Sequence, residues 1–193
     1  MALKCQSYGC DRYADKRGYC EMHYMRLYRS GQISKRTNAD RFWALVDKSG
    51  ECWEWTGGLR GGGYGLFKLQ SPEGKRVSIG AHRFAYAEQF GPIPDGMQID
   101  HKCHNRRCVN PKHLRLATHK QNVENLAGLR ADNTSGYRGV EFRPNLKRWR
   151  ACAQHNKKFY SAGWYESPEE AAEAAKQLRL SLFTHNDLDR RTA

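Results

Sequence analysis

Four residues of the types that bind zinc lie close together near the start of the chain. Two close pairs, Cys5/Cys10 and Cys20/His23, are separated by nine residues. Thiolate sulfur and imidazole nitrogen are the usual tetrahedral ligands of Zn²⁺, and a short hairpin that wraps one ion can fold without a large core. The spacing predicts a small zinc module. The module is either purely structural or also contacts nucleic acid through Arg26 and Arg29.

A second group of ligand-type residues is denser. Cys103, Cys108 and His113 are spaced by five residues each within one loop. A structural zinc site takes four ligands, and Cys52 on an upstream strand is the economical fourth candidate. Six of the seven cysteines are then used, which leaves Cys152 as a buried strand thiol. Disulfides are the weaker interpretation, because the cysteine count is odd and the polar first residues do not resemble a secretory signal.

The second group lies in a loop that two strands and a helix must hold. Short apolar runs predict strands at Met97–Ile99 and Leu114–Ala117. A capping-box pattern that begins at Thr118 predicts a helix through about Leu129. This order of elements predicts that the loop 101–113 is framed by a strand pair and the helix that follows it.

Further elements are predicted on both sides of this loop. Upstream, a meander of short strands precedes a helix, with glycine-rich and Pro-Glu-Gly turns between the strands. Its elements are Cys52–Thr56, Tyr64–Gln70, Arg76–Ile79 and the helix Ala81–Phe90. Downstream, three strands precede an alanine-rich helix, at Tyr137–Phe142, Arg148–Gln154, Lys158–Trp164 and 168–182. The polar stretches Arg29–Asp40 and Leu129–Gly136 are predicted linkers.

The residues around the loop resemble a known nuclease family. The chain reads His101-Lys-Cys-His-Asn-Arg-Arg-Cys-Val-Asn-Pro-Lys-His-Leu114, with Asn122 on the following helix. This pattern is similar to that of the HNH and His-Cys-box homing endonucleases, which have the ββα-metal nuclease fold. The resemblance covers roughly Phe42–Leu129 and includes the upstream motifs Ala81-His-Arg-Phe-Ala-Tyr86 and Gly91-Pro-Ile-Pro94.

The resemblance implies particular roles for three residues. His101 would be the general base at the end of the first strand, and Asn122 a ligand of the catalytic Mg²⁺, for which Mn²⁺ can substitute. In some members the residue at Asp100 is a second ligand of that ion. The chemistry fits these residue types, because a neutral imidazole near its pKa can take a proton from water while Mg²⁺ neutralises the scissile phosphate.

The resemblance also implies which residues are not catalytic. In the His-Cys-box branch the positions of Cys103, Cys108 and His113 bind structural zinc, so the last histidine of the motif is not a catalytic group. An arginine near the leaving group is common in the family, and Arg83 or Arg60 could serve. The alternative is that the histidines belong to a purely structural zinc knuckle without catalysis.

The last segment resembles the plant APETALA-type, or ethylene-response-factor, DNA-binding domain, which also occurs fused to HNH nucleases. The likeness covers about Ser135–Leu182, and its marks are the Tyr-Arg-Gly-Val start, a strand-two tryptophan and a Glu-Ala-Ala helix. It implies a three-stranded sheet that reads the major groove, while Trp164 is expected in the core between sheet and helix. The candidate contacts to bases or phosphates are Arg138, Arg143, Arg148, Trp149, Arg150 and Lys157.

Composition limits the remaining choices. The formal net charge of the 193 residues is +13 and is spread over all three segments, which indicates a polyanionic partner. A hydrophobic fraction of 39% and a mean hydropathy of −0.88 leave little for one large core and favour small modules. The sequence has no apolar run of about 18 residues, so we expect a cytoplasmic protein without a secretion signal.

These observations predict an α+β protein of three modules. They are a zinc finger and linker at 1–40, a zinc-stabilised ββα-metal nuclease at 41–131, and a three-stranded antiparallel sheet packed on one helix at 132–193. The predicted function is a homing-type endonuclease of a phage or mobile element, which cuts duplex DNA to 5′-phosphate and 3′-hydroxyl ends using two structural Zn²⁺ and a catalytic Mg²⁺. A homodimer is possible. The alternative is a zinc-dependent, sequence-specific DNA-binding regulator whose nuclease centre is inactive.

Overall fold

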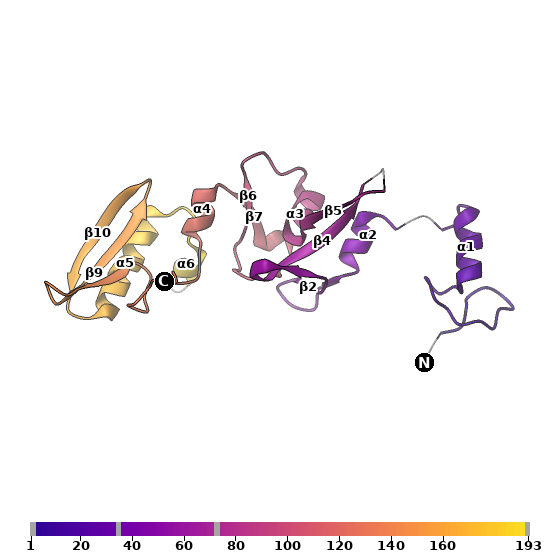
Figure 1. Ribbon diagram of the computed structural model, residues 1–193, viewed down its shortest axis with the longest axis horizontal. Helices are drawn as coiled ribbons and strands as arrows, with labels where there is room; N and C mark the ends of the chain where they lie inside the picture. Colours follow the sequence, from indigo (N-terminus) through magenta and orange to yellow (C-terminus); the bar gives the residue numbers. More distant parts are fainter. Residues whose placement is uncertain (1–2, 34–35, 72–73, 192–193) are drawn as a thin grey trace. The chain divides into compact units, whose positions relative to one another are not determined.

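The computed structural model describes residues 3–33, 36–71 and 74–191, and the chain falls into two compact units, Met1–Ala44 and Leu45–Ala193. Residues 34–35 of the first predicted linker and residues 72–73 of a predicted turn lie outside the described residues. The second unit holds both the predicted nuclease elements and the C-terminal sheet (Figure 1).

The first unit contains two short helices. Helix α1, Glu21–Arg29, directly follows Cys20, and helix α2 spans Asn38–Trp43. Helix α2 begins inside the predicted linker, where Thr37 Oγ1 accepts a hydrogen bond from the Asp40 amide at 3.0 Å and the Asp40 carboxylate accepts one from the Thr37 amide at 2.9 Å. Six residues are too few to show helical periodicity, so this reciprocal cap was the only signal in the sequence.

The second unit begins with short antiparallel strands that form two sheets, and not the single meander that the sequence predicted. Strand β1, Val46–Asp47, pairs with β2, Glu54–Trp55. A second sheet has the order β3-β4-β5 and is followed by helix α3. Its elements are β3, Leu59–Arg60, the 3₁₀ turn η1, Gly61–Gly63, β4, Tyr64–Gln70, β5, Arg76–Gly80, and α3, Ala81–Phe90.

Aromatic side chains form the core of this part. The ring of Trp55 meets Phe67 edge-on at a centroid distance of 5.8 Å, and Phe67 lies 4.9 Å from Phe84 of α3. Gly65 allows this close packing, because a Cβ there would lie 2.7 Å from the Trp55 ring and 2.8 Å from the Ala81 side chain. Helix α3 is therefore held tightly against strand β4.

Two strands and a helix then frame the loop 101–113, as predicted. Strand β6, Gln98–His101, pairs antiparallel with β7, Leu114–Ala117, and helix α4, His119–Glu124, follows. A 3₁₀ turn, η2, Pro111–His113, leads into β7. Thr118 forms the predicted capping box. The helix ends at Glu124 and not near residue 129, because the next side chain, Asn125, turns inward to donate hydrogen bonds to Asp100 at 3.0 and 3.1 Å.

The C-terminal part is a three-stranded antiparallel sheet covered on one face by a helix (Figure 1). The strand order is β10-β9-β8, with β8 at Val140–Arg143, β9 at Arg148–His155 and β10 at Lys158–Tyr165. Helix α5, Pro168–Leu182, is capped by Ser167, and a last helix, α6, spans Asp187–Arg191.

Small side chains let α5 approach this sheet closely. Ala171 and Ala175, one helical turn apart, are fully buried against Val140 and Ala151. Gly139 precedes β8 with a φ of +78°, and a Cβ there would lie 2.4 Å from the Cys152 carbonyl oxygen. Only glycine fits this position.

The architecture confirms the predicted α+β class. Small helices and antiparallel sheets alternate along the chain, and two Cys/His clusters could each hold a zinc ion. Among the described residues, no helix is both long and apolar enough to cross a membrane.

Candidate active site

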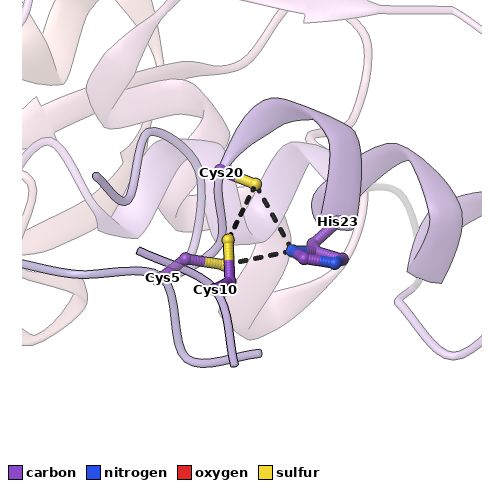
Figure 2. A group of neighbouring side chains, drawn as sticks. All are labelled: Cys5, Cys10, Cys20 and His23. Carbon is purple, nitrogen blue, oxygen red and sulfur yellow. Dashed lines mark hydrogen bonds between the residues drawn. The ribbon is translucent and has the colours of Figure 1, made fainter. Parts of the chain in front are cut away.

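The first Cys/His cluster converges on one point in the N-terminal unit (Figure 2). Its ligand atoms all lie within 4.8 Å of one another. The Nδ1 atom of His23 is 3.5 Å from the Cys5 sulfur and 3.4 Å from that of Cys20, and the sulfurs of Cys10 and Cys20 are 3.9 Å apart. A tetrahedral Zn²⁺ would place two sulfurs about 3.8 Å apart and a sulfur and a nitrogen about 3.6 Å apart. The cluster could therefore hold a zinc ion.

The second cluster draws together three separate segments of the chain. Cys52 precedes β2, Cys103 and Cys108 lie in the loop after β6, and His113 ends the 3₁₀ turn before β7. The ligand atoms again lie within 4.8 Å of one another, and His113 Nδ1 is 3.6 Å from the sulfurs of both Cys52 and Cys108. A hydrogen bond from Cys108 lowers the pKa of Cys103 to about 5 although burial opposes the shift. A thiolate is the form that binds zinc.

His101 is oriented by a backbone group within this second cluster. The side chain is buried, with 7% exposed, and its Nε2 lies 3.1 Å from the carbonyl oxygen of Cys108. A carbonyl oxygen only accepts hydrogen bonds, so Nε2 must carry the proton. The lone pair is then on Nδ1, the atom that could act as a base. Burial lowers the pKa of His101, so the ring is neutral near pH 7.

A second buried histidine, which the sequence did not mark as functional, lies against His101. The ring centroids of His82 and His101 are 4.9 Å apart, and Tyr64 lies 5.6 Å from the first and 6.0 Å from the second. Burial lowers the pKa of His82 to about 3, and repulsion from His101 adds to the shift. Its position in the motif Ala81-His-Arg-Phe-Ala-Tyr86 was the available signal.

A cleft beside His101 brings the predicted catalytic residues together. It has a volume of about 280 Å³, and Asp100, His101 and Asn122 all line it. Arg106 lines the same cleft, and its guanidinium lies 5.5 Å from the centre of the Tyr64 ring. Neither arginine suggested by the sequence is part of this lining. The segment after α4, residues 126–130, forms another part of the wall.

The two predicted magnesium ligands both line this cleft but differ in their surroundings. Asn122 Nδ2 donates to Gln98 at 2.7 Å, which orients the amide and leaves its oxygen for another partner. Asp100 is 4% exposed, and Arg115 Nε and Nη2 donate to its Oδ2 at 2.9 and 2.7 Å. One carboxylate and one amide oxygen fit Mg²⁺, which retains waters and binds substrate phosphate at its other positions.

The face of the C-terminal sheet opposite α5 carries basic and aromatic side chains. Arg150 lies on this face with its guanidinium 4.5 Å from the centre of the Phe159 ring and 5.7 Å from that of Trp164. By strand alternation Arg143 and Arg148 lie on the same face. The expectation that Trp164 is in the core is wrong, since the side chain is 40% exposed.

Three of the other predicted DNA contacts lie in different environments. Lys157 is exposed in the tight turn between β9 and β10 with a φ of +62°. Trp149 packs against the core beneath α5, 4.9 Å from the ring of Phe142, so strand alternation directs it away from the open face. Arg138 donates to the carbonyl oxygens of Leu126 at 2.8 Å and Glu124 at 2.9 Å. The structure thus gives Arg138 two contacts within the protein.

Two families match this chain in the regions just described. Residues 80–124 match the family model described as HNH endonuclease, and residues 135–185 match the AP2 domain. The first region contains α3, the strand pair β6–β7, the loop with His101 and helix α4, and the second contains the sheet and α5. The chain therefore carries an HNH endonuclease domain followed by an AP2 domain, as its motifs predict.

Several curated phage proteins are similar to parts of this chain. Protein 7.7 of Escherichia phage T7 is 45% identical over 76 residues, which are 39% of this chain and 55% of that protein. Protein 2.8 of the same phage is 39% identical over 77 residues, 40% of this chain and 49% of that protein. The uncharacterized gene 5.3 protein of Enterobacteria phage T3 is 36% identical over 62 residues, 32% and 61% of the two chains.

The chain thus spans about half to three fifths of the length of these relatives. No solved structure matches the chain.

Proposed function

We propose that this protein is a metal-dependent DNA endonuclease in which His101 is the general base. The observation that carries the proposal is the hydrogen bond from His101 Nε2 to the Cys108 carbonyl at 3.1 Å. This bond leaves Nδ1 as the basic atom in a cleft that Asp100 and Asn122 also line. A base held in one tautomer and kept neutral by burial is what proton abstraction from water requires.

The proposed reaction is hydrolysis of one phosphodiester bond at a time. His101 Nδ1 takes a proton from water while the water oxygen bonds to phosphorus, the bond from phosphorus to the 3′ oxygen breaks, and the leaving 3′ oxygen takes a proton from a second water molecule. The products carry a 5′-phosphate and a 3′-hydroxyl. Mg²⁺ held by Asp100 and Asn122 would supply positive charge to the phosphate and the leaving oxygen. Arg106 lines the cleft and is proposed to contact the phosphate, in place of Arg83 or Arg60.

Duplex DNA is the proposed substrate, and the open face of the AP2 sheet is its proposed binding surface. Arg143, Arg148 and Arg150 on this face, with Lys157 in the adjoining turn, are placed to meet phosphates or base edges. Glu141 accepts hydrogen bonds from Arg143 and Arg150 in the free protein. DNA would have to displace these internal bonds, so Glu141 is expected to weaken binding that is not specific.

Both Cys/His clusters are proposed to bind structural zinc. The second ion would hold the loop whose Cys108 carbonyl orients His101, so its role in catalysis is to position the base. The similarity to phage proteins supports a role in a phage, and we propose that this role is that of a homing-type nuclease of a phage or mobile element.

A DNA-binding regulator with an inactive centre is the second candidate. It is favoured by the ion pair of Asp100 with Arg115, because a carboxylate already paired with a guanidinium is a poorer magnesium ligand. Such a protein would bind duplex DNA with strong salt dependence and would not hydrolyse it.

Incubation of supercoiled plasmid with the zinc-loaded protein separates these candidates. With Mg²⁺ or Mn²⁺ we expect nicked or linear product that DNA ligase reseals, since ligase needs a 5′-phosphate and a 3′-hydroxyl. The control adds EDTA after zinc loading and is expected to stop cleavage. Retained duplex binding without metal-dependent cleavage at high enzyme concentration would favour the regulator.

A further inference from the structure

The chain continues past its AP2 domain and turns back onto the nuclease elements. The AP2 match ends at residue 185, and the HNH match ends at residue 124. Residues 186–191, which include α6, lie outside both matches and make several polar contacts to the strands and helix that frame the cleft. We name this segment, Asn186–Arg191, the clasp.

Asp187 of the clasp contacts two residues that bind Asp100, the neighbour of the proposed base. Arg115 on β7 binds Asp100 and, from the other side, the carboxylate of Asp187. The backbone amide of Asp187 donates to Asn125 Oδ1 at 2.9 Å, while the other end of the same amide side chain donates to Asp100. At the far end of α6, Arg191 donates to the Lys102 carbonyl at 2.6 Å.

The clasp is tied equally well to the AP2 helix. Arg179 on α5 donates to both carboxylate oxygens of Asp189, at 2.7 and 3.0 Å, and also to the Arg138 carbonyl at 2.6 Å. Asn186 is fully buried and donates to Asp189 at 2.6 Å. Charged groups that are buried and paired in this bidentate way hold one geometry.

A second set of contacts runs alongside the clasp. Arg138 of the AP2 domain binds the carbonyl oxygens at the end of α4, as described above. Glu124 on the last turn of α4 is 5% exposed and lies 3.0 Å from Nδ1 of His155 on β9. The two domains are thus joined at both the strand pair and the helix of the nuclease.

We infer that the clasp and Arg138 fix the AP2 sheet on the nuclease, so that DNA is cut at a set distance from the sequence that the sheet binds. Only the part that concerns the position of cleavage rests on the proposed nuclease function. It assigns Asp187 and Arg138 as specificity-determining residues, although neither would touch the DNA. Their effect is on where the scissile phosphate lies relative to the bound sequence.

The length of the connecting segment shows why such a contact matters. Without the contacts, the domains would be joined by the residues between Asn125 and Ser135 alone. A flexible linker of nine residues has a root-mean-square span of about 17 Å. Duplex DNA rises about 3.4 Å per base pair, so a free linker would spread cleavage over about 5 base pairs.

The first test measures whether the two domains move as one body, and it does not depend on cleavage. Nitrogen-15 relaxation of the full zinc-loaded chain gives a rotational correlation time for the amides of residues 98–124 and another for residues 140–182. We expect equal values for wild type. The double variant Asp187→Ala/Arg138→Ala should give two distinct, shorter values, while Asp95→Ala, at an exposed acid in a nuclease loop, should match wild type.

A more conservative double variant controls for the possibility that the alanine variant does not fold. Asp187→Asn with Arg138→Lys keeps the side-chain sizes near those of wild type and is expected to give values between the two extremes. Unequal correlation times in wild type, or equal ones in a folded double variant, would overturn the inference.

The second test maps nick positions on a plasmid that wild type cuts. Wild type should cut within one base pair at each site, and the double variant should spread nicks over several base pairs. An unchanged distribution would also overturn the inference. If no protein cuts DNA, the proposed function fails while the relaxation data still decide whether the clasp joins the domains.

Discussion

At the scale of single residues, one backbone carbonyl links the proposed zinc site to the proposed chemistry. Cys108 offers its sulfur to the cluster and its carbonyl oxygen to His101 Nε2. The protein thereby fixes which nitrogen of His101 carries a proton without needing a carboxylate partner. A general base whose tautomer is set by a loop of the proposed zinc site depends on that loop for its geometry.

His82 should make the protein less stable in acid. Its pKa is about 3 in the folded state, lowered by burial, against about 6.5 in an unfolded chain. The unfolded state therefore binds a proton that the folded state does not, and stability is lost as pH falls below about 6.5. We expect this residue to cost about 2 kcal/mol between pH 7 and pH 5.

Urea unfolding of wild type and His82→Gln at both pH values measures this contribution. Protonation of the zinc ligands affects both proteins alike, so the difference between their pH dependences isolates His82. Equal loss of stability in the two proteins would contradict the assignment of a low pKa.

At the scale of elements, the backbone conformation and close packing of two glycines contribute to the stability of the AP2 domain. Gly136 and Gly139 both have a φ of +78°, but only the second faces a neighbour, since a Cβ there would lie 2.4 Å from the Cys152 carbonyl oxygen. Gly139→Ala is expected to lower the free energy of unfolding by more than about 2 kcal/mol, whereas Gly136→Ala should cost about 1 kcal/mol for its φ alone. Denaturant titration compares them, and equal costs would show that the close approach to the carbonyl is unimportant.

The zinc clusters should differ in their effect on cleavage. Cys108→Ser and Cys20→Ser are each expected to lower bound zinc from two ions per chain to one, measured by elemental analysis. Only Cys108→Ser removes a proposed zinc ligand from the loop that orients His101. The rate of nicking should therefore fall about 100-fold in Cys108→Ser and stay near the wild-type rate in Cys20→Ser at saturating enzyme. Equal nicking rates in the two variants would show that zinc binding by the second cluster does not orient His101.

Much of the element order could be read from the sequence, because turn residues and capping boxes act locally. The strands and helix around the loop 101–113 and the helix from Pro168 were predicted in this way. Helix α2 and the early end of α4 were not. The end of α4 depends on Asn125 reaching Asp100, a contact between residues 25 apart, which no local pattern records.

Some residues of the candidate site could also be predicted from the sequence, and others could not. His101, Asn122 and the eight cluster ligands could be found because their types and spacing are unusual. Arg106 and the role of Arg138 could not, since arginine is common in this basic chain and only the folded structure shows which guanidinium lines the cleft. Trp164 was misplaced because sequence cannot tell which face of β10 meets α5.

At the scale of the whole molecule, the net charge of +13 predicts DNA binding that weakens steeply with salt. Arg143→Ala and Arg148→Ala should each reduce the slope of log K against log salt by about 0.9 for every phosphate that the variant no longer binds. Lys176→Ala is the matched control, because α5 covers the opposite face of the sheet. Fluorescence anisotropy with duplex DNA measures the slopes. A change of equal size in the control would show that the open face of the sheet is not the DNA-binding surface.

The central claim is that His101 is the general base of a nuclease, and its most direct test is plasmid nicking by His101→Ala. His185→Ala is the matched control, since His185 lies outside the lining of the cleft. With equal zinc content and equal duplex binding, we expect nicking by His101→Ala to fall at least about 100-fold while the control cuts like wild type. Cleavage by His101→Ala at the wild-type rate would contradict the account.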